Sequence, residues 1–237
     1  LPMDQWIHSD ADFETFLQHK LAQEANLQQV FQWQPESAFA QAEFARCLAK
    51  HLLTHHSATF ALAGDDLLHK ASGRCWPVAT GSLWQASLWA QEDFCLLEKK
   101  PDEPHSDYVL TAASVCSPSN WLLENKIGTS VEQIHKPVPG YEGQLAARVN
   151  RFIDSMRNDR AYQRFNWSLQ PGNELLWHGA KATRSETQSR ADIYWRVERQ
   201  TFVKLPQSGA VVFAIARLPE DERRYKNLDC FFNTGNN

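Results

Sequence analysis

The stretch S-P-S-N-W-L-L-E-N-K-I-G-T-S-V-E-Q-I-H-K-P-V-P-G-Y, residues 117–141, separates two groups of predicted strands and therefore decides the fold. Ser117, followed by a proline, is typical of a helix N-cap with proline at the first helical position. Gly128 favours the left-handed conformation that ends a helix. Thr129, with Glu132 three residues later, predicts a capping box. The stretch is therefore expected to form two short helices.

His135 lies on the last turn of the second predicted helix. Pro137 disfavours the helical conformation at Lys136, so this helix must end there, and Pro139 and Gly140 stiffen the chain that follows. A solitary histidine near a helix end most often caps carbonyl groups or interacts with the helix dipole. The alternative is that the rigid turn holds the imidazole as a ligand.

Predicted helices and strands lie on both sides of this stretch. The helices cover about 10–24, 36–53, 82–91 and 142–157, and the strands cover 59–63, 93–98, 108–116, 162–169, 192–205 and 210–217. Short connections within the two later strand groups make neighbouring strands antiparallel. The prediction is an α+β fold: a PAS-like five-stranded antiparallel sheet with a helical crossover, plus N-terminal helices.

The order of predicted helices and strands divides the chain into three parts. Residues 1–57 are expected to form a helical extension that packs on the main domain, 58–218 a PAS-like domain, and 219–237 a C-terminal tail. The polar stretch between Gln170 and Ala191 has no clear periodicity, and loops of that length are often lids or inserts.

Composition excludes several classes of function. The 237 residues carry 24 basic and 28 acidic side chains, a formal charge of −4, so neither a nucleic acid nor an acidic membrane surface is an expected partner. The sequence has no apolar run near the length of a membrane span and no signal peptide, which predicts a soluble, cytoplasmic protein. The 5 cysteines form no C-x-x-C pair, so neither a zinc knuckle nor covalent haem attachment is expected.

Charged residues occupy the long predicted strand 192–205. Arg196 and Glu198 share one face of it, and Arg199 lies on the other. One interpretation is an exposed strand face with an ion pair of little energetic weight. The other is a buried carboxylate and guanidinium beside a ligand, because burial of such charges is costly unless they are paired.

Other polar residues favour structural roles when taken alone. Arg164, Asn166 and Ser168 share one face of the preceding strand, where an ordinary polar sheet face is the simpler interpretation. His51 and His55 lie one helical turn apart, but no third metal ligand accompanies them, so a solvated helix face is expected. No nucleophile elbow, P-loop or G-x-G-x-x-G motif occurs, which argues against a nicotinamide cofactor bound in the usual way.

Four runs in this order resemble the haem-dependent oxidative N-demethylase alpha-subunit-like family. They are S-P-S-N-W-L-L-E-N-K-I-G, I-H-K-P-V-P-G-Y, R-F-N-W-S-L and W-R-V-E-R-Q-T-F-V-K-L-P-Q-S-G-A-V-V-F-A-I, and the resemblance is closest over about 92–217. It implies a haem-binding PAS fold that oxidatively demethylates dimethylamine or a related small amine with O2. It also implies that a separate flavin and iron–sulfur reductase subunit supplies the electrons.

The resemblance makes His135 the leading candidate for axial ligand of a non-covalent haem b. A neutral imidazole can ligate iron through one nitrogen while the other donates to a carbonyl group. The remaining residues assigned to cofactor binding are Arg164, Asn166, Trp167, Lys126 and Phe152.

Glu198, Arg196 and Arg199 are the candidate catalytic residues implied with this cofactor. Glu198 is expected to pair with a cationic amine, and the arginines to polarise bound oxygen or pair with propionates. Glu198 and Arg199 point to opposite faces, so both cannot line one pocket unless the strand is bulged. The alternative functions are a haem-PAS sensor or ligand-binding protein without turnover, and a relative that has lost its haem.

Overall fold

The computed structural model describes residues 1–99, 106–119, 121–137, 144–171, 174–176 and 193–218. The expected tail at 219–237 lies outside the described residues, as do residues 101–105, Pro139, Gly140 and most of the stretch between Gln170 and Ala191.

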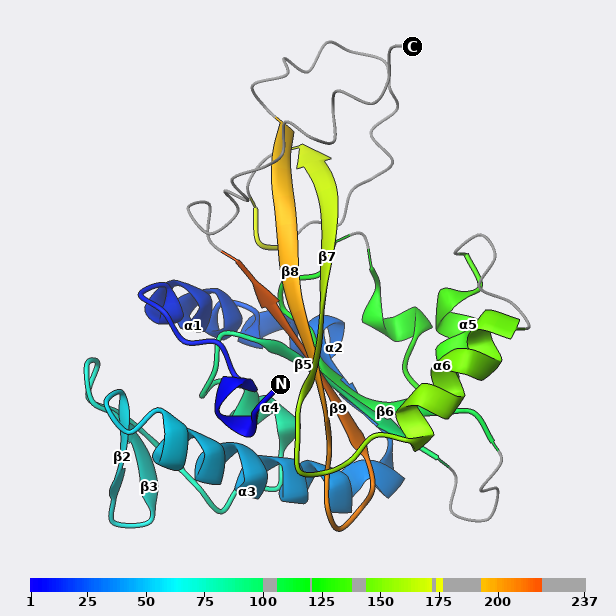
Figure 1. The fold of residues 1–237 in the computed structure, drawn as a ribbon. Coiled ribbons are helices and arrows are strands. Elements are labelled where there is room, and N and C mark those ends of the chain that lie inside the picture. The colour runs from blue at the N-terminus through cyan, green and yellow to red at the C-terminus, as the bar shows by residue number, and fades with distance from the viewer. Residues whose placement is uncertain (100–105, 120, 138–143, 172–173, 177–192, 219–237) are drawn as a thin grey trace, which may run out of the picture.

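Helices and strands of the described residues follow the predicted order (Figure 1). The helices are α1 (Phe13–Leu21), α2 (Leu27–Val30), α3 (Ala38–His55), α4 (Leu83–Ser87), α5 (Val131–His135) and α6 (Gln144–Asp154). The strands are β1 (Phe31–Trp33), β2 (Phe60–Ala63), β3 (Asp66–His69), β4 (Arg74–Pro77), β5 (Asp93–Glu98), β6 (Val109–Ser114), β7 (Tyr162–Pro171), β8 (Ile193–Lys204) and β9 (Val211–Arg217).

The main sheet has six strands in the order β1-β6-β5-β9-β8-β7, and all neighbouring strands are antiparallel. The five predicted strands of the sheet and the α+β class are confirmed. β1 was not predicted; it adds to the edge of β6, with Phe31 opposite Ser114. A separate three-stranded sheet, β2-β3-β4, also forms, and only β2 was predicted.

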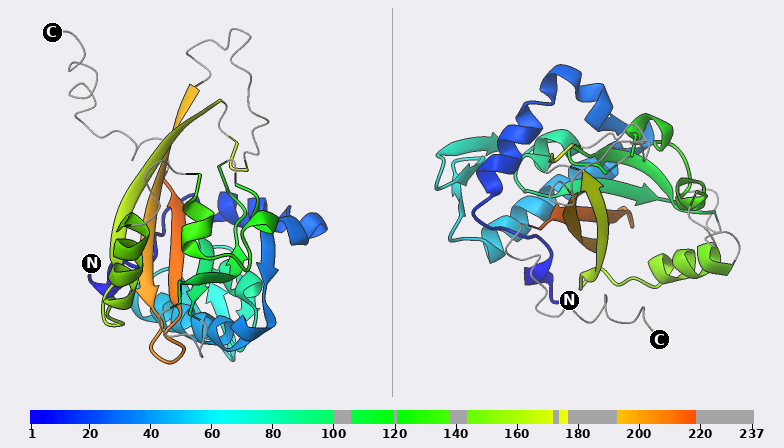
Figure 2. Two further views of the ribbon diagram at one scale, coloured as in Figure 1. Left: turned by 90° about the vertical axis from the view of Figure 1, so that its right-hand side faces the viewer. Right: turned by 90° about the horizontal axis from the view of Figure 1, so that it is seen from above.

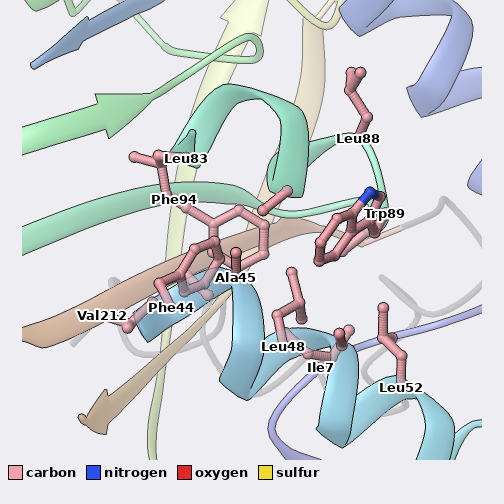
Figure 3. Packing of buried hydrophobic residues seen from close by; sticks show 14 of the residues in the cluster. Ile7, Phe44, Ala45, Leu48, Leu52, Leu83, Leu88, Trp89, Phe94 and Val212 are labelled. Carbon is pink, nitrogen blue, oxygen red and sulfur yellow. The ribbon is translucent and has the colours of Figure 1, made fainter. Parts of the chain in front are cut away.

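Each face of the main sheet has its own hydrophobic core, because successive side chains of a strand point to opposite faces. On β5, Phe94 and Leu96 belong to a core with α1, α3 and α4, part of which Figure 3 shows around Phe94. Cys95 and Leu97 belong to the second core, with α5 and α6. Figures 1 and 2 accordingly place α5 and α6 on the side of the sheet away from α1 and the three-stranded sheet.

The N-terminal segment packs into the first core. Trp6 is buried there, and its carbonyl accepts hydrogen bonds from Arg199 and Thr201 of β8. Residues on both sides of position 57 therefore share one core, and the division into a helical extension and a main domain stays a prediction. No helix among the described residues combines the length and apolar character that crossing a bilayer requires.

His51 corrects the expectation of a solvated face on α3. Its side chain is buried against the Trp6 ring at 5.1 Å, and burial lowers its pKa from 6.5 to about 3. Between these two pH values the unfolded chain binds a proton that the folded chain does not, so the free energy of unfolding falls as the pH falls.

We expect the free energy of unfolding to fall by about 2 kcal/mol between pH 6.5 and pH 5 because of His51, at about 1.4 kcal/mol for each pH unit. Urea unfolding of the His51→Phe variant should therefore show a shallower loss of stability over this range than the original chain. His55→Phe, which changes an exposed side chain that contributes less than burial to the lowered pKa of His51, is the control and should keep most of the original slope. Equal slopes for His51→Phe and the original chain would contradict the assignment.

Candidate functional site

A cavity of about 370 Å³ lies between the main sheet and helices α5 and α6. Its lining is mainly apolar, with polar groups on the sheet side, a pattern typical of sites for cofactors and small molecules. The lining residues are Asp93, Cys95, Leu97, Leu110, Val115, Ser117, Pro118, Ser119, Trp121, Val131, Ile134, His135, Val149, Ile153, Arg164, Asn166, Ser168, Glu198, Phe202, Phe213 and Ile215.

Helix α5 is fixed to the sheet by main-chain hydrogen bonds from the residues just before it. The Gly128 N–H donates to the Leu110 carbonyl at 2.8 Å, and the Leu110 N–H donates to the Thr129 carbonyl at 3.0 Å. Gly128 has φ of +76°, the left-handed conformation expected of it, and this turn directs the chain into α5. The start of α5 therefore cannot move independently of β6.

The capping box of α5 is one residue later than predicted. Ser130, and not Thr129, is the N-cap, and Gln133 takes the place of Glu132. The Thr129 hydroxyl instead donates to the Lys126 carbonyl at 2.7 Å, so it is not available as the cap. Both candidate residues can cap a helix, and the competing hydrogen bond decides between them.

His135 is the last residue of α5, as predicted, and its half-buried ring lines the cavity. Its Nδ1 lies 2.8 Å from the Val131 carbonyl oxygen. A carbonyl can only accept, so Nδ1 carries the proton and Nε2 carries the lone pair. This is the tautomer in which a histidine binds a metal through Nε2, with the ring held by its backbone partner.

Cys95 also lines the cavity, but its chemistry differs from that of His135. Burial raises the pKa of the Cys95 thiol well above its usual range, with Asp93 contributing in the same direction. The sulfur therefore stays neutral at physiological pH, whereas a cysteine ligand must be a thiolate. The imidazole is thus the better ligand for a metal in this cavity.

Glu198 supplies a carboxylate to the sheet side of the cavity. Arg196 Nε donates to its Oε1 at 2.8 Å, and Gln200 Nε2 donates to its Oε2 at 2.9 Å. Asn166 Nδ2 lies 3.4 Å from the same Oε2. These donors hold the Glu198 carboxylate in one orientation with its charge facing the cavity.

Arg196 does not line the cavity, and its side chain is almost completely buried behind Glu198. Besides Glu198, its guanidinium donates to the carbonyl groups of Ser117 and Leu175. The Arg196–Glu198 pair is thus the buried alternative of the two interpretations that the sequence left open. Because Arg196 touches the cavity only through Glu198, it can act as a positioning residue for that carboxylate.

Two other predicted residues reach the cavity from β7. Arg164 and Asn166 lie on its lining face together with Ser168, and Arg164 Nε donates to the Gln200 side chain at 2.6 Å. Both Arg164 and Asn166 are exposed, so they lie where the cavity opens to solvent. A guanidinium at this opening suits an anionic group of a bound molecule.

Besides Arg196, four predicted site residues lie away from the cavity lining. Trp167 is on the opposite face of β7, where it is 60% exposed and stacks on Trp195. Arg199 points to the N-terminal segment, since β8 has no bulge that would turn it to the face of Glu198. Phe152 is exposed on α6 beside Tyr162, and Lys126 donates to the Ile134 carbonyl at 3.5 Å.

Sequence reasoning missed Asp93, a second carboxylate at the cavity. It is 3% exposed, and its two oxygens accept hydrogen bonds from the backbone N–H groups of Cys116 and Ser117 at 3.0 and 2.8 Å. Burial raises the pKa of Asp93, while the nearby Lys20 ammonium opposes the rise. The sign in the sequence was an acidic residue at the start of an apolar strand. Such a residue usually marks only the strand boundary.

The Ser117 turn also differs from the prediction. Ser117 and Pro118 do not begin a helix; the first helical turn after them is the short 3-10 helix Leu123–Asn125. The reason is the backbone of Ser117, whose N–H donates to Asp93 and whose carbonyl accepts from Arg196. These two contacts hold residue 117 in the cavity wall.

A known family matches almost the whole chain. The model of one family, described as haem-dependent oxidative N-demethylase, alpha subunit-like, matches residues 1–220. The match includes all the residues that line the cavity.

Proposed function

The chain belongs to this haem-dependent oxidative N-demethylase alpha-subunit-like family, and on that premise we propose that it binds a non-covalent haem b and oxidatively demethylates a small methylated amine. The observation that carries the proposal is the pairing of one imidazole with one fixed carboxylate in a single apolar cavity. His135 lies on the helix side of this cavity and Glu198 on the sheet side.

The residues present fit a haem. A haem needs only one imidazole from the protein, and His135, whose Nδ1 is bonded to the Val131 carbonyl, would hold it through Nε2. Leu97, Val149 and Phe213 are among the apolar residues that would contact the ring system. Arg164, at the opening, would pair with a propionate. No group of three or more His, Cys, Asp or Glu side chains suited to a metal occurs among the described residues, so direct binding of a bare ion is less well supported there.

Glu198 would bind the substrate. A protonated methylamine is a small cation, and the carboxylate fixed by Arg196 and Gln200 provides the opposite charge in an apolar surrounding, where such a pair is stronger than in water. A bound haem iron supplies the activation of O2 and the oxidation of the methyl C–H bond. With two electrons and two protons from a reductase, the net reaction would convert O2 and one N-methyl group to water and formaldehyde and would leave the demethylated amine.

Four finer statements belong to the same proposal. Dimethylamine is the proposed substrate, and a flavin and iron–sulfur reductase subunit is the proposed source of the two electrons. A PAS-like classification is supported by the order of two strands, short helices and three strands. A cytoplasmic location is supported by Cys47, Cys75, Cys95 and Cys116, which are all free thiols in the structure.

Formaldehyde release tests the proposed reaction. The haem-loaded protein, supplied with O2 and a surrogate reductant, should release formaldehyde from dimethylamine in an amount matching the methylamine formed. Amine binding that changes the haem spectrum without formaldehyde release would instead favour the sensor or ligand-binding alternative. The absence of both amine binding and formaldehyde release would contradict the proposed substrate class.

Replacement of Glu198 tests the substrate site. The Glu198→Gln variant keeps the shape and loses the charge, so we expect the Kd for dimethylammonium to rise by about tenfold or more. The measurement is a spectral titration of the haem-loaded variant. Glu98→Gln is the control, since Glu98 is a half-buried carboxylate on β5 that bonds Thr111 and does not line the cavity. An unchanged Kd in Glu198→Gln would show that the amine binds at another residue.

A further inference from the structure

The backbone of Ser117 is bonded at its N–H and at its carbonyl by two buried polar side chains. Asp93 Oδ2 accepts its N–H at 2.8 Å, and the guanidinium of Arg196 donates to its carbonyl oxygen. Asp93 is 3% exposed and Arg196 is 1% exposed, so water does not compete for either contact. The two contacts bond the N–H and the carbonyl of one residue, on two successive peptide units, and so fix the backbone of Ser117 firmly.

The same guanidinium connects this peptide to the cavity. Arg196 Nε donates to Glu198 at 2.8 Å, and a second terminal nitrogen donates to the Leu175 carbonyl at 3.2 Å. A guanidinium is planar, so its nitrogens cannot be reoriented one at a time. The position of the Ser117 carbonyl therefore determines the direction from which Arg196 meets the Glu198 carboxylate.

Asp93 is itself held in place by its surroundings. It is the first residue of β5, where it pairs with Ile215 of β9, and its second oxygen accepts the Cys116 N–H at 3.0 Å. The Lys20 ammonium, which is buried nearby, favours the charged form of Asp93. Asp93 thus anchors residues 116 and 117 to the centre of the main sheet.

We infer that Asp93 and Arg196 are positioning residues that hold the backbone of Ser117 at its N–H and at its carbonyl, and thereby fix the Glu198 carboxylate toward the ligand in the cavity. The part of this inference that concerns the ligand rests on the proposed function. The part that concerns the peptide does not, and it can be measured without any ligand. If Asp93 had only a structural role, it would hold the turn at residues 116 and 117, and its loss would not affect the Glu198 carboxylate.

Hydrogen exchange of the Ser117 amide tests the contact between the two residues. The Arg196→Gln variant keeps the Asp93 side chain and removes the guanidinium that bonds the Ser117 carbonyl. We expect this amide to exchange about tenfold faster in Arg196→Gln. Arg199→Gln is the matched control, because it removes an arginine from the other face of the same strand, and there the Ser117 amide should keep its original rate. An unchanged rate in Arg196→Gln would overturn the inference.

The effect on Glu198 is tested by amine affinity in two backgrounds. We expect Asp93→Asn to raise the Kd for dimethylammonium by about tenfold, because one of the two oxygens that accept the backbone N–H groups is replaced by an NH2 group, which can only donate. In the Glu198→Gln background the same substitution should change the Kd less than twofold, since the carboxylate that it positions is gone. Equal effects in both backgrounds would overturn the inference.

Two further variants separate positioning from general destabilisation. Arg196→Lys keeps the charge without the planar fork, so we expect it to restore less than half of the affinity lost in Arg196→Gln. Asp10→Asn also removes a carboxylate that accepts a backbone N–H, from Asp12 at 2.8 Å, but at a site outside the cavity lining, and it should leave the Kd unchanged. Full recovery of affinity in Arg196→Lys would show that charge alone suffices and would overturn the inference.

The proposed function and the positioning inference fail in different ways. If Glu198→Gln binds dimethylammonium as well as the original chain, the substrate site is wrong, whatever the exchange data show. If exchange at Ser117 still responds to Arg196→Gln in that case, the hold on the peptide is supported on its own.

Discussion

Replacing His135 with alanine should reduce haem affinity by more than about 100-fold. Changing only the hydrogen-bond partner of a metal-binding histidine typically costs about 10- to 100-fold, so removal of the imidazole itself should cost more. Val131 and Ile134 would still line the cavity, but apolar contacts alone would not hold the iron. The purified variant should therefore lose its Soret absorption during gel filtration, while the original protein retains it.

A second variant separates loss of the ligand from loss of the fold. Because the imidazole lies at the end of a short helix fixed to β6, its removal should leave a space that a free imidazole can fill. We expect 10 mM imidazole to restore haem binding to His135→Gly, with 10 mM as an order-of-magnitude estimate for a weak ligand. His69→Ala, in the separate three-stranded sheet, is the control and should keep its haem. Retention of haem by His135→Ala would exclude the ligand role.

The Lys20→Met variant should lose about 3–5 kcal/mol of stability, because three buried carbonyl groups lose their donor and each buried group left without a partner costs about 1–3 kcal/mol. Lys20 is 1% exposed, and its ammonium donates to the carbonyl oxygens of Ser87, Ala90 and Glu92. Methionine fills a similar volume but leaves these three acceptors without a donor, and Asp93 loses its nearest cation. For a chain of this size the thermal midpoint should fall by roughly 10 °C.

Lys50→Met is the control for this prediction. Lys50 is an exposed lysine on α3, so the same exchange there should change the free energy of unfolding by no more than about 0.5 kcal/mol. Urea unfolding followed by tryptophan fluorescence measures both variants. Similar midpoints for Lys20→Met and Lys50→Met would show that the three carbonyl contacts contribute little.

Much of the main sheet follows from the sequence. The segments now seen as β5, β7, β8 and β9 were each predicted to within about two residues, because period-two patterns and short connections leave few alternatives. β1 was missed because it has only three residues, too few for any pattern to be recognised. β3 and β4 were also missed, although they have four residues each, as β2 does, and β2 was predicted.

The buried charges could not be predicted in this way. Lysine and glutamate are expected at the surface, and nothing local distinguishes Lys20 or Glu92, both 1% exposed, from surface residues. Their burial results from contacts between α1 and the residues before β5, which are far apart in sequence. Asp93 was missed for the same reason, because its partners are backbone groups of Cys116 and Ser117.

The candidate site was predicted in part. Strand alternation correctly separated Glu198 from Arg199, and no bulge brings them together. It could not show that Trp167 lies on the exposed face, because that depends on which face of the sheet α5 and α6 cover. His135, Arg164, Asn166 and Glu198 do meet at one cavity, and their roles there stay predictions.

An equilibrium titration of the purified protein with haem, followed by absorbance, tests the central claim most directly. The account predicts saturation at one haem per chain, with a sharp Soret band that shifts when dimethylammonium is added. A gradual increase without saturation, equal to that of an unrelated protein of similar size, would contradict it.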